Sequence, residues 1–354
     1  MVHVAVVGAG IIGAALADAL VRRGASVTVL DSGAPGAGTS GWSLAWLNAN
    51  EKLPRHYHEL SVRGVREWRG LAHGLPWHVP TGSLAWAETD AQREALGRRL
   101  ERLRGWDYPA EEISVRRAGE LEPALRIPRD ARVAYFSGEA FLDGTAAVGA
   151  LLDRAVAGGA RLVRGEVAVE VRGSGVAGAR LPDGEVVRAD VYVCCTGRRA
   201  PRLLEPLGFR IPLVDPDEAG SPAPCPVSRT SGGAPIGRVV NAPRISMRPL
   251  ATRGLQLEVP VGHDAENVLA EAAKVLDRFD AGEVRRHVCV RPLPVDGHPI
   301  VGWLPGWRNV YVSVTHSGMT LAAVLARLAA AEIVGGGPGD ELGAYRPDRF
   351  ADGA

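Results

Sequence analysis

The chain has 354 residues, with 41 lysines and arginines against 40 aspartates and glutamates, so its formal net charge is +1. This balance gives no electrostatic case for binding nucleic acid or an anionic membrane, and no uninterrupted apolar run reaches the length of a membrane span. The length allows two domains with cores of their own. The four cysteines form no CxxC pair and no histidine cluster accompanies them, so we expect no metal site, no disulfide framework and a cytoplasmic location.

The chain opens with a pattern of strand, glycine-rich turn and helix. Residues 3–7 are apolar and rich in valine, as in a buried parallel strand. Gly8, Gly10 and Gly13 follow at the GxGxxG spacing, which allows a tight turn, close approach of a pyrophosphate, and packing of the helix on the strand. The predicted helix, 11–23, would direct its N-terminal amides at phosphate groups.

A second apolar strand, 26–30, runs directly into Asp31. An acid at this position accepts hydrogen bonds from a ribose 2′-hydroxyl and repels a 2′-phosphate, which disfavours NADP. Strand, glycines, helix, strand and acid in this order predict an adenine dinucleotide site, although the pattern does not distinguish FAD from NAD. The structural alternative is a glycine-rich turn in the core.

The rest of the chain alternates between the two kinds of regular structure, which predicts an α/β protein. We expect further helices at 55–72, 90–104, 144–158, 265–279 and 320–334. We expect further strands at 81–87, 133–136, 161–164, 167–171, 175–181, 186–188, 189–195, 244–247, 255–259 and 309–314. The segment 212–235 is rich in proline, glycine and serine and is expected to be a loop.

The order of these elements indicates a discontinuous nucleotide domain. We assign 1–78, 140–212 and 286–354 to it, and 79–139 and 213–285 to an inserted second domain. The strands expected at 244–247 and 255–259 suit an antiparallel sheet in the inserted part.

Five further motifs complete the pattern. They are Gly38-Thr39-Ser40, Phe141-Leu-Asp143 before a helix, Cys195-Thr196-Gly197 after a strand, Arg291-Pro292 with Asp296-Gly297 and Gly302 after it, and His316-Ser317-Gly318. With them, nearly the whole chain resembles the flavoprotein family of D-amino-acid oxidase, glycine oxidase and monomeric sarcosine oxidase. The resemblance implies a Rossmann-like FAD-binding domain with an inserted, mostly antiparallel substrate domain.

The resemblance also implies that the dinucleotide is FAD. The residues it places at the cofactor are Gly8, Gly10, Ile11, Ile12 and Gly13 at the pyrophosphate, Asp31 and Ser32 at the adenosine ribose, Gly38, Thr39 and Ser40 at phosphate or ribityl oxygens, Val167 at the adenine, Thr196 and Gly197 along the pyrophosphate, and Gly318, Met319 and Thr320 at the pyrimidine edge of the flavin.

The implied activity is oxidation of a C–N bond in an amino acid or amine, by hydride transfer to flavin N5 with formation of an imine. Arg291 is the candidate for the substrate carboxylate, which a guanidinium binds bidentately; the alternative is an ion pair with Asp296. His316 is a candidate for hydrogen bonding to substrate or flavin, or for capping the last helix. Asn48 and Lys52 are placed near the flavin without an assigned role.

Two positions bear on how this chain differs from its relatives. Cys289 stands at the register of the cysteine that carries covalent flavin in monomeric sarcosine oxidase, and the alternative is a small buried strand residue. In sarcosine oxidase a lysine helps oxygen to react with the reduced flavin, and Gln256 stands at the matching position of this chain. The electron acceptor is therefore left open between O2 and another oxidant.

The acidic residues of the 212–235 loop suit either a lid that favours cationic substrates or a solvated loop.

Two other functions remain open from the sequence. One is oxidation of a 2-hydroxy acid, with His316 or His56 as the base on the alcohol. The other is a flavin-binding subunit of a hetero-oligomeric dehydrogenase. In each case the substrate is a small molecule, with neither nucleic acid nor membrane involved.

Overall fold

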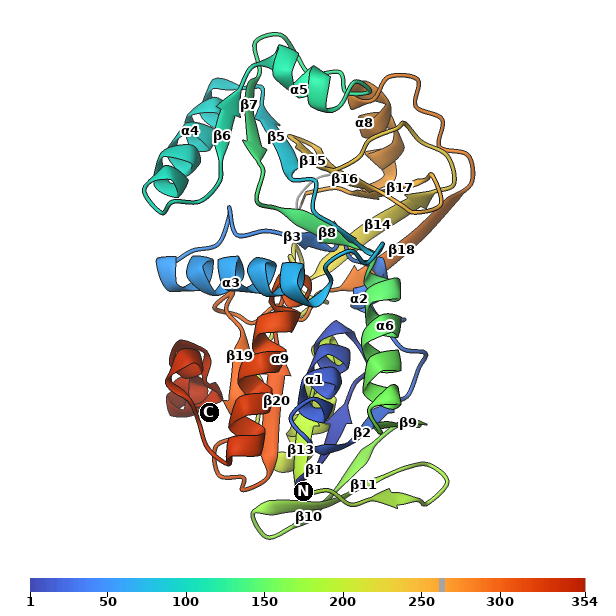
Figure 1. Ribbon diagram of the computed structural model, residues 1–354, viewed down its shortest axis with the longest axis vertical. Coiled ribbons are helices and arrows are strands. Elements are labelled where there is room, and N and C mark those ends of the chain that lie inside the picture. The colour runs from blue at the N-terminus through green and yellow to red at the C-terminus, as the bar shows by residue number, and fades with distance from the viewer. Residues whose placement is uncertain (261–264, 354) are drawn as a thin grey trace. The chain divides into compact units, whose positions relative to one another are not determined.

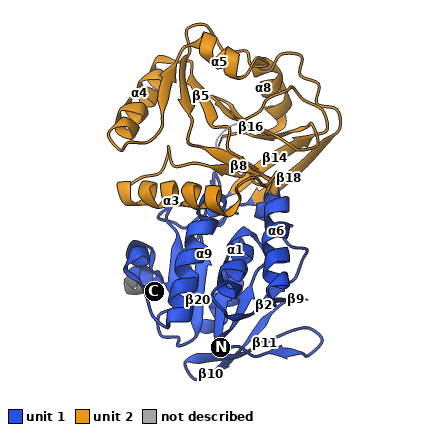
Figure 2. Ribbon diagram, in the orientation of Figure 1, with its two compact units in different colours: residues 1–41, 144–223, 290–354 blue, residues 42–143, 224–289 orange. Residues whose placement is uncertain are grey.

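The computed structural model describes residues 1–260 and 265–353, and of these the side chains up to Phe350. The chain divides into two compact units (Figure 2). Unit 1 comprises residues 1–41, 144–223 and 290–354, and unit 2 comprises 42–143 and 224–289. Helices and strands alternate along the chain, as expected for the α/β class, and each unit is built from separate segments of the chain (Figure 1).

Unit 1 is built on a six-stranded sheet in the order β19-β20-β13-β1-β2-β9. Its strands are β1 (His3–Val7), β2 (Ser26–Asp31), β9 (Arg161–Arg164), β13 (Val191–Cys194), β19 (Ile300–Trp303) and β20 (Val310–Val314). All neighbours are parallel except β19, which runs antiparallel to β20. The nearly continuous apolar runs of the central strands follow from burial on both faces.

Three helices pack on unit 1's sheet: α1 (Ile11–Val21), α6 (Gly144–Ala157) and α9 (Gly318–Gly335), with α1 in contact with both others (Figure 1). The short α2 (Thr39–Trp42) spans the boundary between the units. By length and hydropathy alone, α9 is the one described helix that could cross a membrane, but 72% of it is buried inside the protein, as in a core helix.

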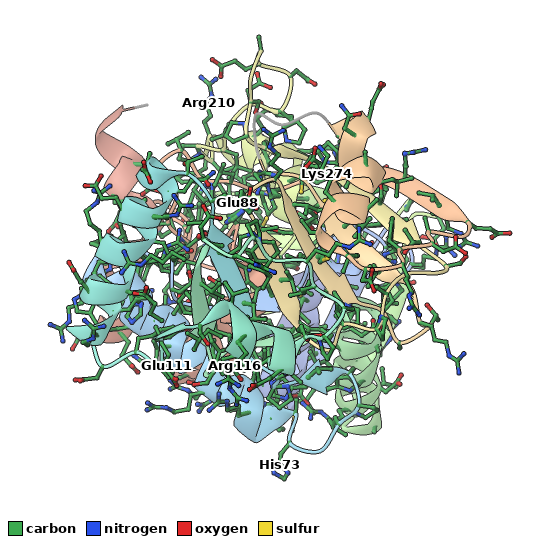
Figure 3. The ribbon with its side chains drawn as sticks, turned by 90° about the horizontal axis from the view of Figure 1, so that it is seen from above. His73, Glu88, Glu111, Arg116, Arg210 and Lys274 are labelled. Carbon is green, nitrogen blue, oxygen red and sulfur yellow. The ribbon has the colours of Figure 1, made fainter. Side chains whose placement is uncertain are left out.

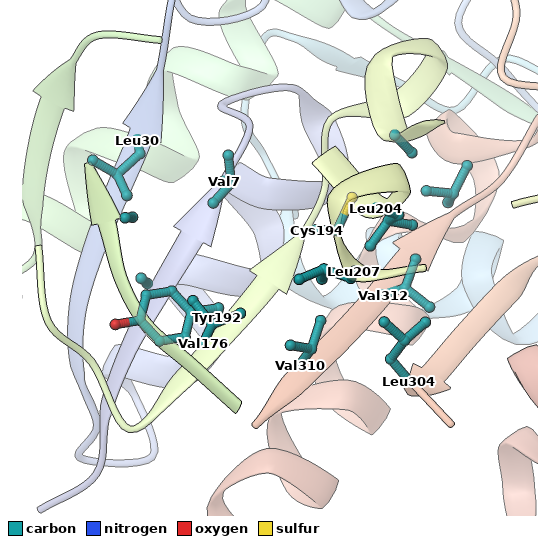
Figure 4. Packing of buried hydrophobic residues seen from close by; sticks show 14 of the residues in the cluster. Val7, Leu30, Val176, Tyr192, Cys194, Leu204, Leu207, Leu304, Val310 and Val312 are labelled. Atoms are coloured by element: carbon teal, nitrogen blue, oxygen red, sulfur yellow. The ribbon is translucent and has the colours of Figure 1, made fainter. Parts of the chain in front are cut away.

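An apolar cluster that includes Val7, Leu30, Tyr192, Leu204 and Val312 packs against unit 1's sheet (Figure 4). The remaining elements of unit 1 are β10 (Ala168–Arg172), β11 (Gly175–Arg180), β12 (Val186–Val187), α7 (Ala200–Leu204) and 3-10 turns at Gly197–Arg199, Glu205–Leu207, Asp340–Tyr345 and Pro347–Gly353. Near the C-terminus, Arg346 pairs with Glu332 of α9 at 2.5 Å, and Tyr311 donates to the same carboxylate at 2.7 Å.

Unit 2 contains an eight-stranded sheet in the order β18-β14-β17-β16-β15-β5-β7-β6 and a small sheet β3-β8-β4. The strands are β3 (Trp46–Leu47), β4 (His78–Val79), β5 (Ser83–Ala87), β6 (Glu111–Ile113), β7 (Arg132–Phe136), β8 (Ala140–Leu142), β14 (Pro224–Thr230), β15 (Val239–Ala242), β16 (Ile245–Pro249), β17 (Leu255–Glu258) and β18 (Val284–Val290). Along the part of this sheet that runs from β14 to β6, neighbouring strands are antiparallel, except that β15 and β5 are parallel.

The helices of unit 2 are α3 (Arg55–Leu71), α4 (Asp90–Arg104), α5 (Val115–Leu121) and α8 (Val268–Val275), with a 3-10 turn at Ala265–Asn267. One face of the large sheet packs in an apolar core that includes Met247 and Leu257 together with Val268 of α8. Charged side chains such as Arg116 on α5 and Lys274 on α8 lie on the exposed surface (Figure 3).

A buried carboxylate joins several elements of unit 2. Glu139 is fully buried, and its two oxygens accept hydrogen bonds from Ser83 (2.6 Å), Tyr108 (2.6 Å), Asn50 (2.8 Å) and Trp46 (2.8 Å). All four donors are neutral. Burial raises the pKa of Glu139 from 4.5 to about 7, because removal from water penalises the charged form more than these donors favour it.

Three expectations from the sequence need correction. The segment 212–235 is not all loop, since β14 occupies Pro224–Thr230. The two prolines of this strand, Pro224 and Pro226, precede residues 227–229, which pair with β17, so they remove no hydrogen bond from that pairing. The helix expected at 265–279 ends at Val275, and Leu276 is extended. Residues 42–78 belong to unit 2, because β3 and β4 pair with β8.

Candidate active site

The glycines after β1 form a turn that only glycine permits at two positions. Gly8 has φ +110°, and a Cβ there would lie 2.5 Å from the carbonyl oxygen of Cys195. A Cβ on Gly13 would lie 1.8 Å from the carbonyl oxygen of Gly8. The first turn of α1 therefore approaches β1 as closely as the backbone allows, as the motif predicts.

The N-terminus of α1 keeps backbone donors for a ligand. Its N-cap residue, Gly10, has no side chain to cap the helix. Among the described residues, Ser40 Oγ is the one side-chain acceptor at these amides, 3.0 Å from Ile11 N. A helix start without a side-chain cap has amides and a dipole that suit a phosphate. Ser40, which the resemblance assigns to phosphate or ribityl oxygens, lies beside the glycine turn.

Asp31 lies at the end of β2, beside the same turn. Its Oδ2 accepts from Ala9 N at 2.6 Å and its Oδ1 from Gly33 N at 2.8 Å. These bonds fix the carboxylate, and each oxygen keeps a further lone pair for a ribose hydroxyl. Ser32 accepts from Arg199 at 3.0 Å.

The other residues predicted at the cofactor also lie in unit 1. The Thr39 hydroxyl donates to Val290 O at 2.9 Å, so it offers lone pairs to a ligand. Thr196 Oγ1 contacts Cys194 Sγ at 3.4 Å, and Gly197 has φ +56°. Gly38 has open space on its Cβ side, and Val167 packs at the edge of the apolar cluster.

A second helix start, that of α9, lies against the first. A Cβ on Gly318 would be 3.6 Å from side-chain atoms of Ile11 and Ile12. The N-cap of α9 is Ser317, which makes no side-chain capping bond. Met319 and Thr320 in its first turn are buried. The two helix N-termini of unit 1 thus converge, as a long dinucleotide requires.

Arg291 and His316 come together in unit 1. Arg291 Nη1 lies 3.5 Å from His316 Nε2, and its Nη2 donates to Pro222 O. Its Nε is buried without a partner. The alternative ion pair with Asp296 is wrong, because Asp296 binds Arg349 instead, with Nε and Oδ2 2.9 Å apart.

This contact fixes the chemistry of the histidine. A guanidinium has no acceptor, so His316 Nε2 must present its lone pair to Arg291. The other ring nitrogen, Nδ1, lies 3.5 Å from Ser317 Oγ. His316 holds one side of the Arg291 guanidinium and leaves it cationic.

The remaining predicted residues belong to unit 2. Asn48 Nδ2 donates to Trp46 O at 3.4 Å, and Lys52 Nζ lies 5.9 Å from the centroid of the Tyr57 ring. Cys289 is buried, and its thiol donates to Cys225 O at 3.5 Å. Among the residues that the structure describes, no group of three His, Cys, Asp or Glu side chains could hold a metal ion.

Sequence reasoning missed one cluster of cations. Arg229 on β14 and Arg248 on β16 flank Gln256 on β17 and share its Oε1, at 3.0 Å and 3.5 Å. The sequence carries only a weak signal, an arginine that alternates with the apolar Ile245 and Met247 in the strand Ile245–Pro249. The register that aligns three strands was not visible in the sequence.

Comparison with known proteins places this geometry in a family. Residues 3–332 match the model described as DAO, FAD dependent oxidoreductase. The chain is 27% identical to an uncharacterized oxidoreductase of Bacillus subtilis (97% of each chain) and 25% identical to glycine oxidase of Geobacillus kaustophilus (92% and 91%). It is 27% identical to D-amino acid dehydrogenase of Methylobacterium sp. strain 4-46 (95% and 96%).

The crystal structure of the Geobacillus glycine oxidase has the same fold, with a TM-score of 0.84 at 23% identity over 99% of both chains. The family match confirms the resemblance seen in the sequence and makes FAD the cofactor. The converging helix starts, the glycine turn and the fixed Asp31 carboxylate fit that cofactor. The chain therefore belongs to the DAO family of FAD-dependent oxidoreductases and is an enzyme.

Proposed function

We propose that this enzyme oxidises the C–N bond of an amino acid or of a primary or secondary amine to an imine. The observation that carries the proposal is the Arg291 guanidinium, buried at its Nε and held by His316 and Pro222 O. A cation fixed in this way can bind a carboxylate through two parallel hydrogen bonds. Binding there would orient the Cα–H bond of an amino acid.

The residues that would hold FAD are those of the glycine turn, Asp31, the Thr39–Ser40 turn and the first turn of α9. When bound, FAD supplies the two-electron acceptor, taking hydride at N5 from the carbon beside the amine. The first amides of α9 are suited to charge on the pyrimidine edge of the ring. No side-chain base is required if the amine binds uncharged.

The contact between Arg291 and His316 favours an amine over a 2-hydroxy acid. Oxidation of an alcohol needs a base to take the hydroxyl proton. His316 Nε2 faces a guanidinium at 3.5 Å, so its lone pair is already engaged.

Anaerobic mixing of the FAD-loaded chain with a panel of amines tests the proposal. We expect glycine, N-methylglycine, alanine of either hand or proline to bleach the visible flavin absorbance, and lactate and glycolate to leave it unchanged. If dithionite bleaches the flavin and no amine does, the proposal fails. Reduction by an amine with the purified single chain would also exclude the need for a partner subunit.

The finer cofactor and acceptor assignments are part of the same proposal. The register of Cys289 supports covalent attachment, whereas its burial and its bond to Cys225 O oppose it. Acid precipitation distinguishes covalent from non-covalent FAD. Flavin that stays in the protein pellet of the wild type, but not in that of Cys289→Ser, would establish covalent attachment at Cys289. Gln256 in place of a lysine supports an acceptor other than O2, and four buried free cysteines support a cytoplasmic location.

A further inference from the structure

The turn after β13 lies at the edge of unit 1's sheet where the cofactor is expected. β13, β1 and β2 are parallel neighbours in that order, so the segments that follow them leave the sheet at one edge. In open α/β sheets, nucleotides bind outside the carboxyl ends of the strands. Because β1 lies between the other two, a contact from the end of β13 to the end of β2 spans about 10 Å, past the start of the glycine turn.

Arg199 makes such a contact. It ends the 3-10 turn Gly197–Arg199, and its Nη1 donates to the Oγ of Ser32, directly after β2, at 3.0 Å. The residue is exposed, and among the described residues its guanidinium makes no other hydrogen bond, ion pair or ring contact. One nitrogen therefore fixes the group at the carboxyl edge of the sheet, while its remaining N–H donors and its planar face are left for a ligand.

A second arginine ties the same helical segment to the next strand end. Arg202, three residues after Arg199 in α7, pairs with Glu166 at 2.5 Å. Glu166 directly precedes Val167, the residue predicted at the adenine. The two arginines thus connect one short segment with both stretches predicted at the adenosine, the end of β2 and the loop after β9. These stretches are neighbours, because β2 and β9 pair in parallel.

The adenine ring suits a guanidinium in this place. Adenine presents a planar aromatic face and nitrogen acceptors, and a guanidinium stacks on such faces and donates along its edge. The diphosphate already has the amides at the start of α1, and the ribose has the Asp31 carboxylate. The adenine has only Val167 assigned to it, so it is the part of the cofactor that the free face of Arg199 matches best.

We propose that Arg199 binds the adenine of FAD with the planar face of its guanidinium, and that Ser32 is the positioning residue that orients this group. The inference adds a determinant of cofactor retention to the FAD site of the family. It concerns the cofactor alone and is independent of the proposed oxidation of an amine.

Release of FAD from the holoenzyme measures this contact without turnover. Every protein carries Cys289→Ser, so that non-covalent contacts alone hold the flavin, and the rise of flavin fluorescence after dilution gives the release rate. We expect Arg199→Gln to release FAD about tenfold faster than this parent, as for loss of a cation–π contact partly removed from water. Arg199→Lys should release FAD nearly as fast as Arg199→Gln, because lysine keeps the charge but lacks the planar face. Arg210→Gln, at another exposed arginine of unit 1, is the matched control and should keep the parent rate.

A double-mutant cycle tests whether Ser32 acts through Arg199. Ser32→Ala alone should speed release about threefold, because the guanidinium loses its hydrogen-bonded anchor. In the Arg199→Gln background the same substitution should change the rate little, since the group that Ser32 orients is gone. Additive effects of the two substitutions would overturn the positioning role of Ser32.

The visible spectrum of the bound flavin separates a contact at the adenine from a wider structural effect. It reports the surroundings of the flavin ring, so we expect it to be unchanged in Arg199→Gln. The parent release rate in Arg199→Gln would overturn the proposal, and so would faster release together with an altered flavin spectrum. Faster release in Arg199→Gln with the parent rate in Arg199→Lys would overturn the adenine contact in favour of charge attraction to the diphosphate.

The test also separates this inference from the proposed function. Release and spectrum are measured in the oxidised enzyme without an amine. Bleaching by an amine, with release unchanged in Arg199→Gln, would keep amine oxidation and refute the role of Arg199. Faster release in that variant, with no amine able to bleach the flavin of the wild type, would keep the role of Arg199 and refute amine oxidation.

Discussion

Replacement of Glu139 by glutamine should change how the stability of the enzyme depends on pH. The folded-state pKa of Glu139 is raised from 4.5 to about 7, so between these values the folded protein holds a proton that the unfolded chain has released. Stability from this group is present in full below pH 4.5 and is lost as the pH rises through 7. At about 1.36 kcal/mol per pKa unit, the loss approaches about 3 kcal/mol.

The measured quantity is the difference in unfolding free energy between wild type and Glu139→Gln, from urea titrations with excess FAD at pH 5 and at pH 8. Protonated glutamate and glutamine have similar shapes, so a constant offset from altered hydrogen bonds cancels between the two pH values. We expect the difference to shift by about 2.5 kcal/mol in favour of the glutamine variant between pH 5 and pH 8, since part of the full loss has already occurred at pH 5.

Glu332→Gln is the matched control. Burial acts to raise the pKa of Glu332, but hydrogen bonds from Arg346 and Tyr311 outweigh it, so the pKa is lowered. This carboxyl is ionised in both folded and unfolded chains across pH 5–8, and its difference should stay constant. A pH-independent difference for Glu139→Gln would refute the reasoning and mean that the four neutral donors keep Glu139 ionised.

Three further substitutions test the candidate site. Arg291→Lys should lower kcat/KM for amines that carry a carboxylate by about 100-fold, mainly through KM, because lysine lacks the forked donor pair; steady-state kinetics with an amine that lacks a carboxylate should show no such loss. Gly13→Ala should abolish FAD retention, because its Cβ would lie 1.8 Å from Gly8 O, whereas Gly149→Ala on α6, with nothing within 4 Å, should keep the wild-type ratio of flavin to protein absorbance. Asp31→Asn should weaken FAD binding about tenfold, because an amide cannot accept from both Ala9 N and Gly33 N; an unchanged Kd in a fluorescence titration of the apoprotein would count against that role.

The parts of the site that depend on neighbours in sequence were predictable. Gly8, Gly10 and Gly13 act through the turn that contains them, and Asp31 follows its own strand, so spacing alone located them. Arg291 and His316 were identified by the resemblance, but their contact depends on how two segments of unit 1 approach.

Features created by strand register were missed. Arg229, Gln256 and Arg248 become neighbours only when β14, β17 and β16 pair in one register. Glu139 gains its four donors from three separate segments of unit 2. The segment 212–235 was misjudged because its proline content outweighed the apolar positions Cys225 and Val227, whose burial depends on β14 having a partner.

The assembly of unit 1 from three stretches of chain has a consequence for synthesis of the enzyme. β1 and β2 leave the ribosome long before β13 and β20, and the second helix start of the cofactor site lies at residue 318. The nascent chain must therefore keep the exposed edge and apolar faces of these strands from aggregating until β20 and α9 have been synthesised. FAD cannot stabilise these early intermediates, so chains truncated before α9 should accumulate as aggregates or be degraded rather than persist as partly functional flavoproteins.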